Sequence, residues 1–436
     1  MPDYVKRDIK RSEINLEQNV AGVNDFGKSR EQKLLTYMFL IYIFLSFFEI
    51  YLSAIIGNIT RYYLLVVIGV YLYTSHFKIH LNYLSKSILI WFFIKMASLL
   101  WSNHTNMGIV QTNIISQVGM TLLVVTITSK SKDVFFLRNC LRTSYWCSFL
   151  FGILSIIFRG AFLDNRFVAR QVLTLWGQQN DPNNCSAFLG IGIALASYSL
   201  FCENRHRLLN ILVIIVNAYA IILTGSRGGF LLLWLLVSCA AILPNWNRQA
   251  VMADTIKKVF VFAVVGVVCI FVIVRFIPSA SLTRVISFDE YQGGTGRMEK
   301  WNLALDLIKS NPILGKGWGG YTIQSNRAIH NTFLTLWCDT GILGLIVFLY
   351  PIIHVFVKSI KNKALLPSLI LLAGIFPAIT VDSINKRFFW NSIIISYLLI
   401  NYLLATGKHI EIWDSMIQSQ SSIEDNESEL EYEETN

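Results

Sequence analysis

The chain has 436 residues, of which 54% are hydrophobic and 15% are charged, and its mean hydropathy is +0.51. That balance excludes an ordinary soluble globular domain, in which about a quarter of the residues are charged. The net charge of +10 is spread over many loops and forms no basic, aromatic-rich patch, so nucleic acid is not an expected partner. The composition predicts an all-α, polytopic membrane helix bundle.

Apolar runs long enough to cross a bilayer recur along most of the chain. The polar first 33 residues do not resemble a signal peptide, so the first run is expected to be a spanning helix. We expect about 12 transmembrane helices, at residues 34–56, 61–75, 84–101, 108–127, 141–159, 184–202, 206–223, 229–243, 258–277, 332–356, 364–381 and 388–406.

Lys and Arg are more frequent in the connections on one side of these spans, which places both termini in the cytoplasm. The expected organisation is a cytoplasmic tail at 1–33, transmembrane helices 1–9 in 34–277, an extracytoplasmic loop with an interfacial helix at 278–331, transmembrane helices 10–12 in 332–407, and an acidic, disordered cytoplasmic tail at 408–436. The short outer connections also hold cations that this orientation does not require: Arg61, Arg159, Arg166, Arg170, Arg227, Lys386 and Arg387.

Two charged residues lie within predicted spans, Glu49 in the first and Lys95 in the third. A buried ion pair between them is the favoured interpretation, and a transport or proton-relay role is the alternative. The seven cysteines lie in or beside apolar runs without a C-x-x-C pair, which is typical of buried apolar filler. No His, Cys, Asp and Glu cluster has the spacing of metal ligands, so no metal and no cofactor are expected.

The outer loop at 160–183 holds Arg166 and Arg170, which would share one face of a helix. It ends in Asp181-Pro182-Asn183, where Asn180 or Asp181 can cap a helix and Pro182 suits the first helical position.

The segment Thr224-Gly-Ser-Arg-Gly-Gly229 interrupts two apolar runs. Its glycines permit a tight turn, and the helix that follows would present free N–H groups and a positive dipole end to an anion. Arg227 and this helix start could therefore hold phosphate, whereas the simpler interpretation is an inter-helix turn with a snorkelling arginine.

The long loop at 278–331 contains Gly293-Gly-Thr-Gly-Arg297, followed by an interfacial helix whose apolar face would be Met298, Trp301, Leu305 and Ile308. Asn311-Pro312 should end that helix. Gly315-Lys-Gly-Trp-Gly-Gly-Tyr321 would suit stacking on a sugar ring or anchoring at the interface. His330 would lie at the outer mouth of the next span, and Asp339 about 180° away around that helix is a poor candidate to orient it.

Several of these motifs together resemble the O-antigen ligase and polymerase superfamily. They are Asp181-Pro-Asn183, Thr224-Gly-Ser-Arg-Gly-Gly229, Gly296-Arg297 with Trp301, Asn311-Pro-Ile-Leu-Gly-Lys-Gly-Trp-Gly319, and His330-Asn331 leading to Asp339-Thr-Gly341 and Gly344. The resemblance covers about residues 170–350. It implies a GT-C-like membrane glycosyltransferase that uses a polyprenyl-diphosphate-linked glycan as donor, at the outer face of a bacterial cytoplasmic membrane.

In this resemblance Arg227 and Arg297 contact the diphosphate and His330 handles the acceptor hydroxyl. The expected catalytic residues are therefore His330, Arg227 and Arg297. The expected substrate-binding residues are Arg166, Arg170, Asn183, Ser226, Trp318, Tyr321 and Asn331. Arginine suits phosphate oxygens and histidine can act as a base near neutral pH, so a metal-independent, inverting transfer is the simplest mechanism.

The favoured function is a polymerase of repeat units for a capsule, an exopolysaccharide or an O-antigen. A ligase that transfers the glycan to a lipid A core or another acceptor is the alternative within the class. A solute or ion transporter and a non-enzymatic scaffold or flippase partner are the rivals outside it, although no inverted repeat is visible. Membrane lipids are expected partners, and a flippase and a chain-length regulator are candidate ones.

Overall fold

The computed structural model describes residues 30–79, 81–102, 107–128, 133–163, 169–243, 297–325 and 328–413. The first half of the chain forms α2 (Arg30–Ile56), α3 (Ile59–Thr74), α4 (Tyr83–Ala97), the 3-10 helix η1 (Ser98–Trp101), α5 (Met107–Ile127), α6 (Val134–Ile157), β1 (Arg159–Leu163), β2 (Ala169–Leu175), β3 (Gln178–Gln179) and α7 (Pro182–Tyr198). The second half forms the π-helix η3 (Ser199–Glu203), α8 (Arg207–Leu223), α9 (Arg227–Ile242), α12 (Arg297–Ser310), α13 (Gly320–Ser325), α14 (Thr332–Lys361), α15 (Leu365–Ala378) and α16 (Arg387–Thr406).

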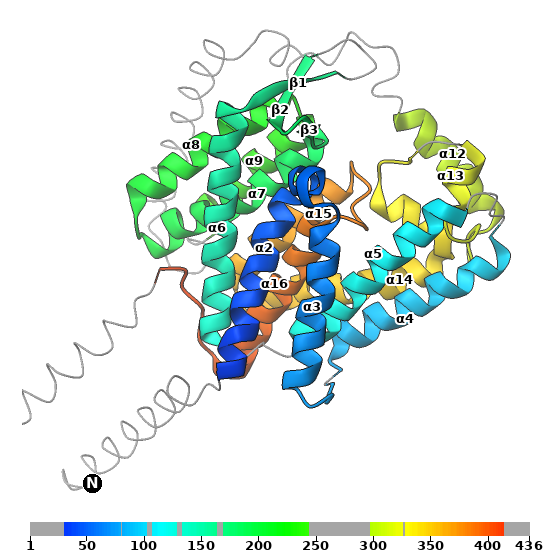
Figure 1. Ribbon diagram of the computed structural model, residues 1–436, viewed down its shortest axis with the longest axis horizontal. Coiled ribbons are helices and arrows are strands. Elements are labelled where there is room, and N and C mark those ends of the chain that lie inside the picture. The colour runs from blue at the N-terminus through cyan, green and yellow to red at the C-terminus, as the bar shows by residue number, and fades with distance from the viewer. Residues whose placement is uncertain are drawn as a thin grey trace, which may run out of the picture.

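The bundle is organised around α7, which is buried at every residue from Asn184 to Ser197. Its glycines let neighbouring helices approach closely: a Cβ on Gly190 would lie 2.7 Å from Leu232 of α9. Helix α16 is similarly buried, and α2, α3 and α6 pack side by side around this centre (Figure 1). Helices that are apolar on all sides thus form the core, as expected of a membrane bundle.

Six helices of the described residues are long and apolar enough to cross a membrane, and five more are apolar but shorter. Every predicted span within the described residues coincides with a helix. The chain is therefore a mostly helical, multi-pass membrane protein, as the composition predicts. The count of about 12 spans and the GT-C-like architecture stay predictions, since the span at 258–277 lies outside the described residues, as do most of both tails.

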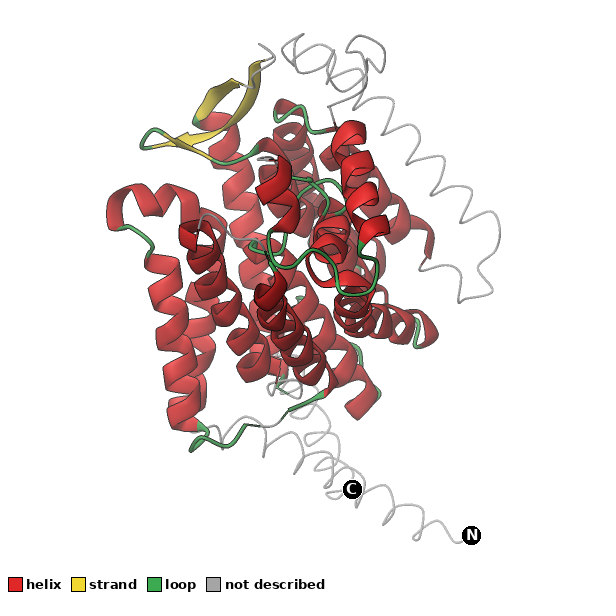
Figure 2. Ribbon diagram, turned by 90° about the vertical axis from the view of Figure 1, so that its right-hand side faces the viewer, coloured by secondary structure: helices red, strands yellow, loops and turns green. Residues whose placement is uncertain are grey.

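The connection between α6 and α7 is a small antiparallel sheet, with strand order β1-β2-β3. Phe162 of β1 pairs with Arg170 of β2, so the helical face considered for Arg166 and Arg170 is wrong. The turn between β2 and β3 is Trp176-Gly177, and both residues have positive φ (49° and 74°), as a two-residue hairpin turn requires. The sheet lies at the upper end of the bundle in Figure 1 and projects from the helical body in Figure 2.

The helix predicted after Arg297 exists as α12 and ends before Asn311, whereas the position of its apolar face at the membrane interface stays a prediction. Ala304, Leu307 and Ile308 are its buried residues, whereas Met298 and Leu305 are 58% and 40% exposed. The buried face packs against α13 and the first turns of α14 in a separate small core (Figure 1). The face that tertiary packing buries is thus rotated from the one that the spacing suggested for the interface.

Candidate functional site

The first turn of α7 is built by its own sequence. Asp181 is the N-cap and accepts from the N–H groups of Asn183 (2.8 Å) and Asn184 (3.4 Å), and Pro182 is the first helical residue. The predicted helix-start signal is thus confirmed. Because backbone groups occupy Asp181, the Asn183 side chain is left to bind neighbours.

Asn183 joins three segments that are distant in sequence. Its Oδ1 accepts from Ser226 Oγ at 2.9 Å and from Arg170 Nη2 at 3.4 Å. Arg170 Nε also donates to the Thr224 carbonyl at 2.8 Å, and its side chain is buried. The predicted residues Arg170, Asn183 and Ser226 are therefore together, but their mutual contacts hold the 224–229 turn against α7. Arg166 lies outside the described residues.

The 224–229 turn is a tight cap on α9. Gly225 has φ 59°, Ser226 is the N-cap and accepts from Gly229 N–H at 3.1 Å, and Arg227 is the first helical residue. A Cβ on Gly229 would collide with Ser186 of α7, which explains the need for glycine at this position. Arg227 is half-buried beside the positive end of the α9 dipole, the arrangement expected of an anion-binding helix start.

His330 lies directly before α14 in a left-handed backbone conformation, with φ 57°. Asn331 is the N-cap of α14 and accepts from the N–H groups of Phe333 and Leu334, both at 3.0 Å. Asn331, predicted to bind substrate, thus serves as a cap. Trp301 Nε1 of α12 donates to the carbonyl of Ile329 at 3.2 Å, which ties α12 to the segment that carries His330.

The starts of α9 and α14 are linked through the segment that follows α15. A Cβ on Gly228 would lie 3.2 Å from Thr380 Oγ1. Thr332 Oγ donates to the Val381 carbonyl and accepts from Ser383 N–H, both at 2.8 Å. Arg227 directly precedes Gly228, and His330 lies two residues before Thr332. The two residues are therefore carried by segments that meet at one end of the bundle.

Burial lowers the pKa of His330, and the nearby cations Lys300 and Arg297 lower it further, whereas Asp181 and Asp382 act in the opposite direction. His330 is therefore neutral near pH 7, the form that can accept a proton. The four charged residues belong to the start of α7, to α12 and to the segment after α15. All three segments are therefore close enough to His330 to affect its charge. Arg297, the first residue of α12, is half-buried.

The aromatic residues predicted to stack on a ligand are buried: Trp318 and Tyr321 are 3% and 2% exposed. The Trp318 ring faces a protein cation instead, with Lys95 Nζ 4.7 Å from its centroid. Tyr321 packs in the small core with Ala304 and Leu307. In this structure both rings therefore have packing roles.

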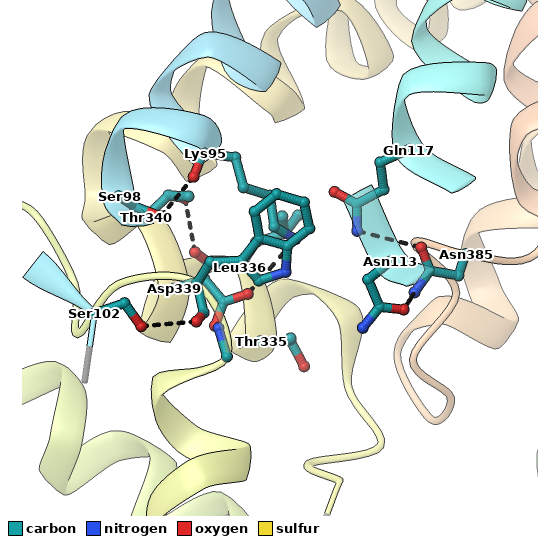
Figure 3. Close-up of polar contacts among 12 residues, drawn as sticks. Lys95, Ser98, Ser102, Asn113, Gln117, Thr335, Leu336, Asp339, Thr340 and Asn385 are labelled. Atoms are coloured by element: carbon teal, nitrogen blue, oxygen red, sulfur yellow. Dashed lines mark hydrogen bonds and ion pairs between the residues drawn. The ribbon is translucent and has the colours of Figure 1, made fainter. Parts of the chain in front are cut away.

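The predicted Glu49–Lys95 ion pair is wrong. Lys95 Nζ instead lies 3.5 Å from Asp339 Oδ2, and both side chains are almost fully buried (Figure 3). Glu49 forms a two-pronged pair with Arg387, at 3.2 and 3.3 Å. Helix packing sets α4 against α14 and leaves α2 near the start of α16, so each charge has a partner that hydropathy could not identify. Because Asp339 is paired in this way, it does not orient His330.

Lys300 and Asp382 are site residues that the sequence reasoning missed. Lys300 follows Arg297 by three residues, so the two share a helix face. Asp382 is an acid in a short connection expected to face outward, close to Lys386. Both signals were visible in the sequence. Within the described residues, no group of three His, Cys, Asp or Glu side chains is placed to hold a metal ion.

Comparison with known proteins gives a curated relative and a family match. A curated protein of Haemophilus influenzae, described as uncharacterized, is 24% identical over 220 residues, which cover 42% of this chain and 54% of that protein. The chain thus spans about half the length of this relative. Residues 211–349 match the family described as O-antigen ligase, a stretch that includes Arg227, Arg297 and His330. This match over about a third of the chain supports the resemblance to the O-antigen ligase and polymerase superfamily that the motifs predicted.

Proposed function

We propose that the protein is a glycosyltransferase of the cytoplasmic membrane that joins polyprenyl-diphosphate-linked oligosaccharide repeat units into a surface polysaccharide, such as a capsule, an exopolysaccharide or an O-antigen. The observation that carries this proposal is the setting of His330: a neutral imidazole, with Lys300 and Arg297 close enough to act on it. A base beside fixed positive charge suits transfer from an anionic leaving group to a hydroxyl.

The proposed reaction is a direct displacement at the anomeric carbon. His330 takes the proton of the acceptor hydroxyl, whose oxygen forms the new bond to that carbon. The bond from the carbon to the diphosphate oxygen breaks, and the lipid diphosphate leaves with the electron pair. Arg227 and Arg297 neutralise its charge, since a guanidinium binds phosphate oxygens and stays protonated. One displacement inverts the anomeric configuration, and no step requires a metal.

Ligase activity is the second candidate, because the matching family is described as O-antigen ligase. The two activities differ only in the acceptor, which is a second lipid-linked repeat unit for a polymerase and a lipid A core or another acceptor for a ligase. A transporter is less well supported, because the charged residues at 49, 95 and 339 are all paired within the bundle.

The test is a transfer assay with purified protein in nanodiscs, supplied with lipid-linked repeat units alone. A polymerase gives a ladder of products that His330→Ala abolishes. His409→Ala is the matched control, because His409 is exposed beyond the end of α16. No ladder, but transfer once a lipid A core is added, would identify a ligase. No transfer to any acceptor would refute the proposal.

A further inference from the structure

A polar cavity of about 250 Å³ lies where the end of α2 meets the beginnings of α3, α5, α7 and α16. It is expected to face the same side of the membrane as Arg227 and His330. Its most frequent lining side chain is asparagine, at positions 58, 113, 180, 184 and 385. Asn184 donates to Asn180 and Asn385 donates to Asn113, so part of each amide is satisfied within the lining. The remaining amide groups make the lining polar.

The cavity also carries positive charge. Arg61, Lys386 and Arg387 line it, and Glu49 is its acidic side chain. Glu49 is paired with Arg387, and Lys386 interacts with Asp382, which is not a lining residue. The lining itself therefore holds more cations than carboxylates. The cations come from separate segments: Arg61 belongs to α3, and Lys386 to the connection before α16.

Three polar atoms of the lining are buried and make no hydrogen bond to any described residue: Arg387 Nη1, Asn184 Oδ1 and Arg61 Nε. Arg387 and Asn184 are each only 3% exposed. A buried donor or acceptor without a partner is costly, and native proteins rarely keep one without a reason. The lining residues thus include two donors and an acceptor that no described residue satisfies.

Two segments of the candidate active site also contribute residues to the cavity. Asn180 and Asn184 line it and are bonded to each other at 3.2 Å, whereas Asn183, between them, reaches toward the 224–229 turn. Asn385 and Lys386 line it from the other side and follow Asp382, which acts on His330. A molecule in the cavity would therefore contact segments that also hold residues of the candidate active site.

Side-chain amides offer a donor and an acceptor together, which matches neighbouring sugar hydroxyls, and the excess of cations in the lining matches an anion. The volume is slightly below the ~300–1,000 Å³ of typical small-molecule pockets, which suits one ring better than an oligosaccharide. We infer that this cavity binds one sugar unit of the glycan substrate, and that this unit carries a carboxylate group. The inference rests on the proposed function, which makes the ligand a glycan.

Saturation-transfer NMR with the full-length protein in nanodiscs tests the inference without any transfer step. The probes are methyl β-D-glucuronide and methyl β-D-glucoside, which differ only in the carboxylate. We expect the glucuronide to bind about tenfold more tightly, the size of one charge-assisted hydrogen bond. Arg61→Gln and Lys386→Gln should each remove most of this preference. Arg159→Gln is the matched control, because Arg159 is an exposed arginine of β1 outside the cavity lining.

Equal binding of the two probes, or a preference that survives in both cavity variants, would overturn the inference. Displacement of the glucuronide by inorganic diphosphate but not by free glucuronate would also overturn it, and would identify a phosphate site. Thermal unfolding of each variant separates loss of binding from loss of fold, and Lys386 is half-exposed, so its variant is expected to fold. If the ladder assay succeeds while the two probes bind equally, only this inference fails. If the glucuronide binds preferentially but no transfer to any acceptor occurs, the proposed transferase function is rejected instead.

Discussion

At the scale of single residues, His330 combines three features that rarely coincide. Its backbone is left-handed, its side chain is half-buried, and its pKa is lowered by burial and by Lys300 and Arg297. Non-glycine residues at positive φ are uncommon and are concentrated at functional sites. The segment is held by the Asn331 cap and by the Trp301 hydrogen bond, so the imidazole is presented from a fixed backbone.

The pH dependence of transfer tests the electrostatic setting of His330. With a lowered pKa, the imidazole stays neutral at neutral pH and is protonated only under more acidic conditions, where activity should fall. Lys300→Gln removes a positive charge near the imidazole. Its removal stabilises the protonated form of His330 and raises the pKa of His330. The acidic limb of the kcat/KM profile should therefore move to higher pH. Lys309→Gln, an exposed lysine on the same helix paired with Asp306, is the control; an unmoved limb in Lys300→Gln would contradict the prediction.

At the scale of elements, the loop between α12 and α13 is locked onto α4 and α14. Lys316 N–H donates to the Cys338 carbonyl at 2.7 Å, and Ser102 Oγ to the Trp318 carbonyl at 2.9 Å. Gly319 N–H donates to Asp339 Oδ1 at 3.0 Å, beside the Lys95 ion pair (Figure 3). These contacts fix the loop between α12 and α13, which is part of the chain that connects Arg297 to His330, so the buried pair can help to position the site.

A double-mutant cycle tests the Lys95–Asp339 pair. Lys95→Met or Asp339→Leu alone leaves an uncompensated buried charge, which should cost about 3–5 kcal/mol of stability. The double variant removes both charges and should lose less than the sum of the single losses by ~1 kcal/mol or more. Unfolding titrations in mixed micelles measure each corner of the cycle. Strict additivity would show that the two side chains do not interact.

Gly341 gives a second test at this scale. It interrupts α14 with φ 67°, and a Cβ there would collide with the Ile313 carbonyl of the same loop. Gly341→Ala should therefore cost about 3 kcal/mol or more and displace the loop. Gly69→Ala is the matched control, because Gly69 lies within α3 with no atom within 4 Å of an added Cβ. That change should be neutral or stabilise by up to ~1 kcal/mol. Equal losses in the two variants would contradict this account.

At the scale of the whole molecule, hydropathy and local signals predicted much of the architecture. Spans follow from apolar length, and the start of α7 follows from Asp181 and Pro182, because both are properties of contiguous sequence. The partners of Glu49 and Lys95 could not be predicted in this way, because ion pairing depends on which helices pack together. The sheet was missed for another reason: the four-residue spacing of the two arginines fits a strand face as well as a helix face.

A common location was expected for the site residues, and their roles stay predictions. A shared membrane face was expected for Arg170, Arg227, Arg297 and His330, because spans alternate in direction, and all four lie on segments that the structure links. The burial of Trp318 could not be deduced from the sequence of its glycine-rich loop. A tryptophan in a loop can stack on a ligand or pack within the protein equally well. Only the tertiary structure places Lys95 against Trp318.

The orientation of the bundle is the remaining whole-molecule prediction, and it decides which side of the membrane supplies the substrate. The positive-inside rule places the sheet and the cavity outside and the connection between α14 and α15 inside. Arg159→Cys in β1 and Lys361→Cys at the end of α14 introduce thiols at exposed positions on the two sides. A membrane-impermeant maleimide applied to intact cells should label the first and should reach the second only after permeabilisation. The wild type sets the background, because four of its six described cysteines are buried. The opposite pattern would place the candidate site in the cytoplasm, where His330 could not meet a glycan exported to the outer leaflet.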